Sequence, residues 1–315
     1  MKKILLSLTT LLFCAAALGQ NSANLKMNLE KNKTYRLRSV TEQTIIQTVN
    51  GNQQTIETFT GNTISLKMVD ATQAFIVAEV RLDTMTTNTN TMGKTSSMSS
   101  TMEGNVKSEE AAEVVSYFMN KISRNPLYVK IDFSGKPTEI VNLKMAAGMV
   151  LKDTSLITVA DPVGAALKKQ ISGMVSEDGI KNSIDGFTNY LPGKTVNTGD
   201  KWSVTTTTNA GGMSLDITTN YKLESVSGNN ASLTSESNIK ASPNAVPMET
   251  GGAKITYDDI KGMSKSSMVI DIRTGLVVEL SSKTHIAGNL GVTVPGMSLE
   301  IPMDINSNST VSLLQ

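Results

Sequence analysis

Residues 33–48 have the sequence KTYRLRSVTEQTIIQT, and their alternation decides the expected fold class. Tyr35 and Leu37 alternate with arginines, which is the two-residue period of a strand with one buried face and one wet face. Residues 49–52 (VNGN) then supply turn formers. The pattern predicts a β-hairpin that begins an antiparallel sheet.

Two further strand-like stretches continue the same pattern. Residues 54–69 and 74–84 alternate apolar and polar side chains, and residues 70–73 (DATQ) separate them as a turn. Residues 85–105 are rich in Ser, Thr, Met and Asn and alternate weakly, so they form either an extended hairpin edge or a loop. Three long antiparallel strands are therefore expected near the start of the mature chain.

The apolar period changes over residues 108–122, where large apolar side chains recur every three or four positions. We expect a helix there, capped by Ser108, followed by a strand over residues 127–133 and a partner strand through Ile140 and Leu143. Two more helices are expected after Asp161-Pro162 and after Ser176. All helices should thus lie between about residues 108 and 188.

The order of strand signals begins again after residue 191. Trp202 follows Asp200-Lys201 as Tyr35 follows Lys33-Thr34. Gly211-Gly212 supplies a turn after this strand, as Asn50-Gly51 does after the first one. This repetition predicts a diverged internal duplication. The expected fold is α+β, mainly β, with two related antiparallel units over residues 20–190 and 191–315, which form either two domains or one continuous body.

The first nineteen residues have the pattern of an export signal. Lys2 and Lys3 precede an apolar stretch, and Ala17-Leu18-Gly19 offers a cleavage site before Gln20. Cys14, the only cysteine, follows Phe13 rather than a small residue, which disfavours a lipid-anchored form. The sequence predicts signal cleavage and a periplasmic or extracellular location.

Composition excludes several classes of function. The formal net charge is +1, and loss of Lys2 and Lys3 with the signal leaves the mature chain near neutrality, which argues against nucleic acid as a partner. Loss of Cys14 excludes disulfides and thiol catalysis from the mature chain. No later apolar run reaches spanning length, so no transmembrane segment is expected after cleavage.

Two short motifs resemble a family of exported Gram-negative bacterial proteins of unknown function. They are residues 29–35 (LEKNKTY) and the stretch from Leu191-Pro192 through residues 196–202 (VNTGDKW). The resemblance covers most of the mature chain and implies export and β-rich architecture, with no established activity. At the level of fold alone, the chain is also similar to periplasmic lipoprotein carriers, whose half-open barrels hold acyl chains.

Candidate catalytic and metal-ligating residues are few and have simpler structural explanations. His285 is the only histidine and is predicted on a strand, without a nucleophile motif beside it. Three methionines at 92, 98 and 102 could bind copper(I), although no cysteine or histidine is nearby in sequence. Adjacent acids are considered for glycoside hydrolysis. Glu109-Glu110 and Glu177-Asp178 are assigned to the first turns of helices, and Asp258-Asp259 to a turn, with a weak calcium site as the less favoured alternative.

The sequence therefore assigns no catalytic, cofactor-binding or metal-ligating residue, and it predicts no cofactor. We expect non-catalytic binding or carriage of a hydrophobic, lipid-like ligand or of an envelope partner, because export and cavity-forming strands are predicted without recognisable catalytic groups. Two alternatives stay open. One is a structural or surface interaction module, and the other is a hydrolase whose Ser, Asp and Glu residues meet only in the fold.

Overall fold

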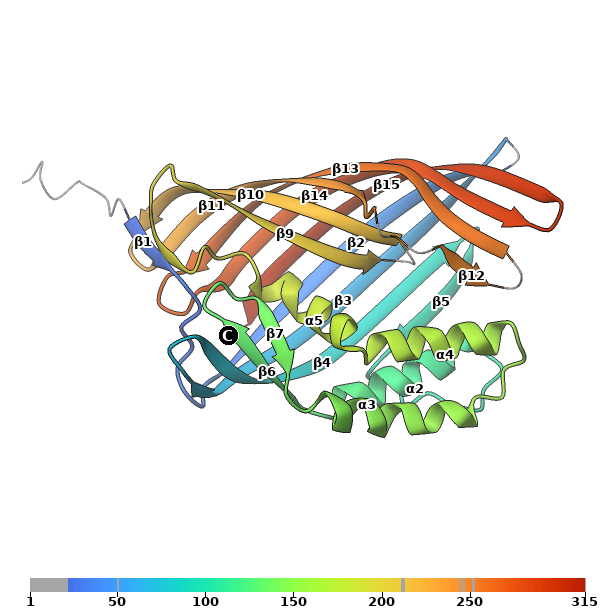
Figure 1. Ribbon diagram of the computed structural model, residues 1–315, viewed down its shortest axis with the longest axis horizontal. Helices are drawn as coiled ribbons and strands as arrows, with labels where there is room; N and C mark the ends of the chain where they lie inside the picture. Colours follow the sequence, from blue (N-terminus) through green and yellow to red (C-terminus); the bar gives the residue numbers. More distant parts are fainter. Residues whose placement is uncertain are drawn as a thin grey trace, which may run out of the picture.

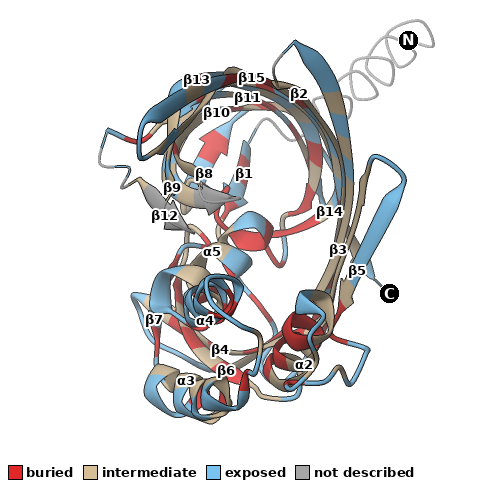
Figure 2. Cartoon of the chain, turned by 90° about the vertical axis from the view of Figure 1, so that its right-hand side faces the viewer, coloured by how far each residue is buried: buried red, intermediate tan, exposed pale blue. Residues whose placement is uncertain are grey.

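One antiparallel sheet dominates the computed structural model, which describes residues 22–49, 51–210, 213–243, 245, 247–250 and 253–314. The sheet bends into an arc, and helices occupy its concave side (Figures 1 and 2). The predicted mainly-β fold with antiparallel strands and a few helices is confirmed. The predicted signal over residues 1–19, Asn50 and the Gly211-Gly212 turn lie outside the described residues.

The strands of this sheet form two meanders, each with neighbours that follow one another along the chain. The sheet order is β7-β6-β4-β3-β2-β15-β14-β13-β11-β10-β9, with β5 on β4 and β12 on β13. The first meander comprises β2 (Thr34–Val49), β3 (Asn52–Ala71), β4 (Phe75–Thr91), β5 (Lys94–Ser99), β6 (Leu127–Asp132) and β7 (Pro137–Ile140). The second comprises β9 (Lys201–Ala210), β10 (Met213–Ser227), β11 (Asn230–Ala241), β12 (Met248–Thr250), β13 (Ala253–Asp271), β14 (Leu276–Val294) and β15 (Met297–Leu314).

The last strand joins the two meanders. β15 pairs with β2 over its C-terminal two-thirds, from Met303 opposite Gln47 to Leu314 opposite Arg36. A separate short pair, β1 (Ser22–Leu25) with β8 (Lys194–Asn197), links the start of the described chain to the segment before β9. The backbone groups of both meanders are thereby paired across their junction.

Four α-helices and one 3₁₀ turn are described, all within the expected interval. They are α2 (Ala111–Ser123), α3 (Leu143–Leu151), η1 (Lys152–Leu156), α4 (Val163–Met174) and α5 (Glu177–Thr188). Ser176 caps α5 by accepting a hydrogen bond from the Gly179 N–H at 3.0 Å. The predicted cap at Ser108 is wrong, because α2 begins at Ala111 and the Ser108 hydroxyl accepts from Glu110 instead.

The expected strand through Leu143 is also wrong beyond Ile140, where β7 ends. Asn142 accepts a hydrogen bond from the Tyr128 N–H at 2.8 Å and donates to the Pro126 carbonyl at 3.0 Å. These bonds tie the chain to the neighbouring strand and allow α3 to begin at Leu143. Of the two alternatives for residues 85–105, the hairpin edge is the one found, since residues 94–99 form β5 against β4.

The main hydrophobic core fills the space between the concave face and the helices. Tyr190, 4% exposed, belongs to this core and donates to the Gly275 carbonyl at 3.1 Å while accepting from the Val277 N–H at 2.8 Å. The indole of Trp202 stacks on Tyr221 at 5.6 Å and donates to the Tyr190 carbonyl at 3.0 Å. Trp202 therefore anchors the start of β9 to the core.

Tyr190→Phe should destabilise the protein by roughly 1–3 kcal/mol, because it removes the acceptor of one buried N–H and the donor to one carbonyl. Tyr128→Phe, on half-buried β6, is the matched control and should change the free energy of unfolding by much less. Urea unfolding followed by circular dichroism measures both. Equal losses in the two variants would contradict the role assigned to the buried hydroxyl.

Candidate ligand-binding face

Hydroxyl side chains cross the concave face in two adjacent rows, which we call the hydroxyl belt. Because alternate residues of a strand face the same side, register identifies the members of each row. One row, in register from strand to strand, contains Ser235, Ser266, Ser282, Ser309, Thr41, Thr60 and Thr87. The next row contains Thr219, Ser237, Ser264, Thr284, Ser307, Thr58 and Thr89, with Gln43 between Ser307 and Thr58.

Neighbouring hydroxyls of the belt bond to each other across the strands. The Ser235 and Ser266 hydroxyls are 2.6 Å apart, and those of Thr41 and Ser309 are 2.9 Å apart at the junction of the meanders. The Thr284 hydroxyl donates to Ser264 at 2.8 Å. Such pairing reduces the cost of holding hydroxyls on a half-buried face.

An apolar row follows the belt on the side away from the main core, and we call it the isoleucine row. Its members are again in register from strand to strand: Ile217, Ile239, Ile286, Ile305, Ile45 and Ile56. Gly262 stands in this row between Ile239 and Ile286, where a Cβ would lie 2.6 Å from the Ile286 side chain. Ile305 is 1% exposed, whereas Ile45, Ile56 and Ile217 are only partly buried.

A hollow of about 520 Å³ lies between the α4–α5 corner and strand β9. Met174, Asp178 and Asn182 line its helical side and Thr208 its strand side. Thr208 is in register with Leu215, which belongs to the same apolar cluster as the isoleucine row. The hollow therefore opens beside the apolar end of the concave face.

Helix α5 brings a carboxyl to the covered part of this face. Burial raises the pKa of Asp185, although a hydrogen bond from Asn189 and the charge of Lys136 oppose the shift. Burial also raises the pKa of Tyr221 to about 12, and the nearby charge of Asp185 adds to that shift. Both groups are therefore held in their neutral forms more strongly than in water.

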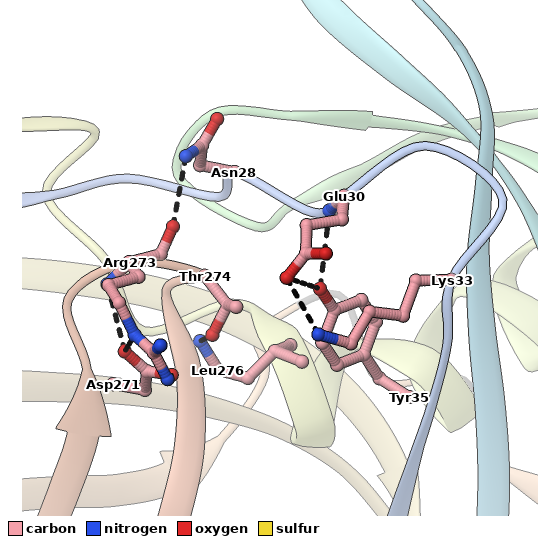
Figure 3. Close-up of polar contacts among 8 residues, drawn as sticks. All are labelled: Asn28, Glu30, Lys33, Tyr35, Asp271, Arg273, Thr274 and Leu276. Carbon is pink, nitrogen blue, oxygen red and sulfur yellow. Dashed lines mark hydrogen bonds and ion pairs between the residues drawn. The ribbon is translucent and has the colours of Figure 1, made fainter.

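The residue 29–35 motif belongs to a polar cluster at the end of the sheet where β13 turns into β14 (Figure 3). Lys33 donates to the Glu30 carboxylate at 2.7 Å, and this bond is the main cause of the lowered Glu30 pKa. Arg273 bonds to both carboxylate oxygens of Asp271, at 3.1 and 2.9 Å. Asn28, the residue before the motif, donates to the Arg273 carbonyl at 2.9 Å and so ties the segment that leads into the motif to the second meander.

The candidate residues named from sequence do not converge on one site. His285, on β14 and 57% exposed, lies 2.6 Å from an Asp304 carboxylate oxygen on β15, on the convex face. Met92 is exposed at the tip of the β4–β5 hairpin, and Met98 packs on the main core. Within the described ranges, no three His, Cys, Asp or Glu residues are placed to hold a metal ion.

The adjacent acids take separate positions. Glu177-Asp178 occupy the first turn of α5, as expected, while Glu109-Glu110 precede α2, which begins at Ala111. Asp258-Asp259 do not form a turn between strands, because the pair lies within β13. The register shifts there, and Asp259 has a φ of 53°, so the pair forms a bulge in the strand.

The belt and the isoleucine row were not identified from sequence. Residues 232–239 (SLTSESNI) and 264–268 (SKSSM) carry serines at alternate positions, which is the signal in the sequence. That signal shows only that one side of each strand is polar. Sequence alone cannot align seven strands, so it cannot place their serines in one row.

Fold and site together define a mainly-β protein with a long, banded concave face. The chain belongs to the family described as a family of unknown function (DUF6263), whose model matches residues 73–277. The resemblance to a family of unknown function is thus confirmed. A search of curated proteins gave no match.

Solved structures with detectable similarity are distant. The COG4313 outer membrane channel from Pseudomonas putida F1 is 7% identical, with a TM-score of 0.27 and coverage of 91% of this chain and 97% of that one. OccK5 (OpdH) from Pseudomonas aeruginosa is 8% identical, with a TM-score of 0.23 and coverage of 90% and 99%. TM-scores this low do not establish a common fold. In the part of the chain that the structure describes, no helix is long and apolar enough to cross a membrane.

Asp185 should make stability depend on pH. Burial raises the pKa of Asp185 in the folded state. The contribution of Asp185 to the free energy of unfolding is therefore complete below the ordinary aspartate pKa of about 3.9, and it is lost as the pH rises through the folded-state pKa. Asp185→Asn should remove this loss and leave the protein more stable than wild type near neutral pH. Urea unfolding at a series of pH values tests this, with exposed Asp178→Asn of the same helix as control. An unchanged pH profile in Asp185→Asn would contradict the assignment.

Proposed function

We propose that this protein binds a lipid-like ligand on its concave face without catalysing a reaction on it. The observation that carries the proposal is the banding of that face, where the hydroxyl belt borders the isoleucine row. An amphipathic molecule has the matching chemistry, because its apolar chain would lie on the isoleucines and its polar end would exchange hydrogen bonds with the belt.

The partial exposure of the isoleucine row and its access to solvent support the same proposal. Ile45, Ile56 and Ile217 retain exposed apolar surface on the concave side, and burial of such surface by a ligand is favourable by about 25 cal/mol per Å². The hollow beside Thr208 offers a route from solvent to the same end of the face. Methionines such as Met213 and Met303 adjoin the row and would adapt to chains of different shape.

Adjacent residues of β2 provide a matched test. Ile45 faces the concave side opposite Ile305, whereas Ile46 faces the convex side opposite Asp304. Protein purified from the cell envelope should carry a lipid mass in native mass spectrometry. Ile45→Asn should lose most of that mass, and Ile46→Asn should retain it, with thermal melting confirming that both variants fold. A wild-type protein free of lipid, or equal lipid in both variants, would refute the proposal.

We further propose that the chain is exported and that its signal is removed before Gln20. The support is the charged, apolar and small-residue order of residues 1–19. The same mass measurement tests this, since the mature protein should begin at Gln20. A mass that includes residues 1–19 would contradict it.

We also propose that the two meanders descend from a duplicated unit. Asn32 and Gly199 both have positive φ, at 64° and 92°, and each precedes the first long strand of its meander. The Asn32 N–H donates to the Met68 carbonyl at 2.8 Å, and the Gly199 N–H donates to the Leu223 carbonyl at 2.7 Å. Both acceptors stand immediately before a register shift in the following strand pair. This shared combination of turn, hydrogen bond and register shift supports a common origin of the two meanders.

Equivalent turns should respond equally to substitution. Asn32→Gly and Gly199→Asn should change stability little, because both residues tolerate positive φ. Asn32→Val and Gly199→Val should each destabilise by about 1–3 kcal/mol, because β-branched side chains are strained there. Chemical denaturation measures all four variants. A large loss at one turn and none at the other would count against equivalence.

A further inference from the structure

A second hollow, of about 440 Å³, lies on the convex face of the sheet, opposite the belt. Its side chains come from β15, β2, β3, β4 and β5, and they stand in register. Asn308, Glu42, Phe59 and Asn88 form one row, and Asn306, Thr44, Glu57 and Asn90 form the next. The volume falls within the range of about 300–1,000 Å³ that is common for small-molecule sites.

One polar atom in this hollow lacks a partner. Asn90 donates through its Nδ2 to a Glu57 carboxylate oxygen at 3.2 Å. A carboxylate accepts hydrogen bonds, so this contact fixes the orientation of the amide. The Asn90 Oδ1 is then buried, and it has no hydrogen-bond partner among the described residues. Because this oxygen is buried, a bound hydroxyl or amine donor would satisfy it once the Asn90 side chain turns toward the hollow.

Phe59 gives the hollow a flat apolar surface among these polar groups. It lies directly between Glu42 and Asn88 in register. Its ring leans over Gly61, since a Cβ at Gly61 would be 3.4 Å from a ring carbon. Phe59 is half-buried, and phenyl faces pack well against the C–H side of a sugar ring.

The charges of the hollow exclude anions. Glu42 and Glu57 line it, and its lining includes no Lys, Arg or His among the described residues. Most of the other polar groups are amides and hydroxyls, which both donate and accept. A neutral polyol can use both the donors and the acceptors of these groups, whereas an ammonium ion can only donate and would leave the amide N–H groups of the asparagines unused.

We propose that this convex hollow binds a neutral carbohydrate of one or two sugar rings, stacked on Phe59 and hydrogen-bonded to Glu57, Asn88 and Asn90. Glu42 and Thr44 point away from Ile45 of the same strand, although Gln43, Thr58 and Thr89 of the belt also contribute to the lining of the hollow. The lipid test changes Ile45 and Ile46, which do not line this hollow, so the two proposals fail separately.

Saturation-transfer NMR of the mature protein tests the site. The probes are maltose, cellobiose, N,N′-diacetylchitobiose and mannobiose. At least one should bind, and Phe59→Ala and Glu57→Gln should each weaken it at least tenfold. Asn220→Ala, on the convex face of β10, is the matched control and should bind as wild type does. Retained melting temperatures in Glu57→Gln guard against loss through misfolding.

Other outcomes overturn the proposal. Failure of every disaccharide to bind would do so, as would binding that all three variants retain. Spermidine is included as a probe, with 1,4-butanediol as its neutral counterpart. If spermidine binds in a Glu57-dependent manner and no sugar does, the hollow is a cation site and the carbohydrate assignment is wrong.

Discussion

The antiparallel pairing of β15 with β2 is the constraint on which the rest of this structure depends. It joins the end of the described chain to the first long strand, so two meanders become one bent sheet. Without it, both meanders would expose a long unpaired edge at the junction. The concave face would also be divided, because the Thr41–Ser309 hydroxyl contact and the Ile45–Ile305 pair both cross this junction.

The two faces of the bent sheet carry different kinds of side chain. On the concave side, the helices cover one end of the face and enclose the main hydrophobic core. The hydroxyl belt lies between this core and the isoleucine row. Hydroxyls tolerate such an intermediate position because they satisfy each other across strands, for example Ser235 with Ser266. On the convex side, amides and carboxylates stand in register around Phe59. The strand period of two assigns each residue to one of these surfaces.

Much of the local structure could be predicted from sequence. Strand alternation gave the long strands, and the change of apolar period located α2, α4 and α5. The failures have physical causes that lie outside any local window. Ile140 to Leu143 has strand-forming residues, but Asn142 bonds to β6 and turns the chain into α3. Asp258-Asp259 resembles a turn, but pairing with β14 before and after the pair keeps it within β13 as a bulge.

The sequence by itself determined the class of fold, the interval that holds the helices and the near-neutral charge, because each follows from composition or short-range period. It also carried the alternating serines and isoleucines. Only the tertiary structure decided that these residues lie in continuous rows and that Asn90 and Phe59 share a hollow with Glu42. The reason is that register between strands distant in sequence depends on pairing across the whole sheet, including β15 with β2, and a single residue of slip would move every side chain to the opposite face.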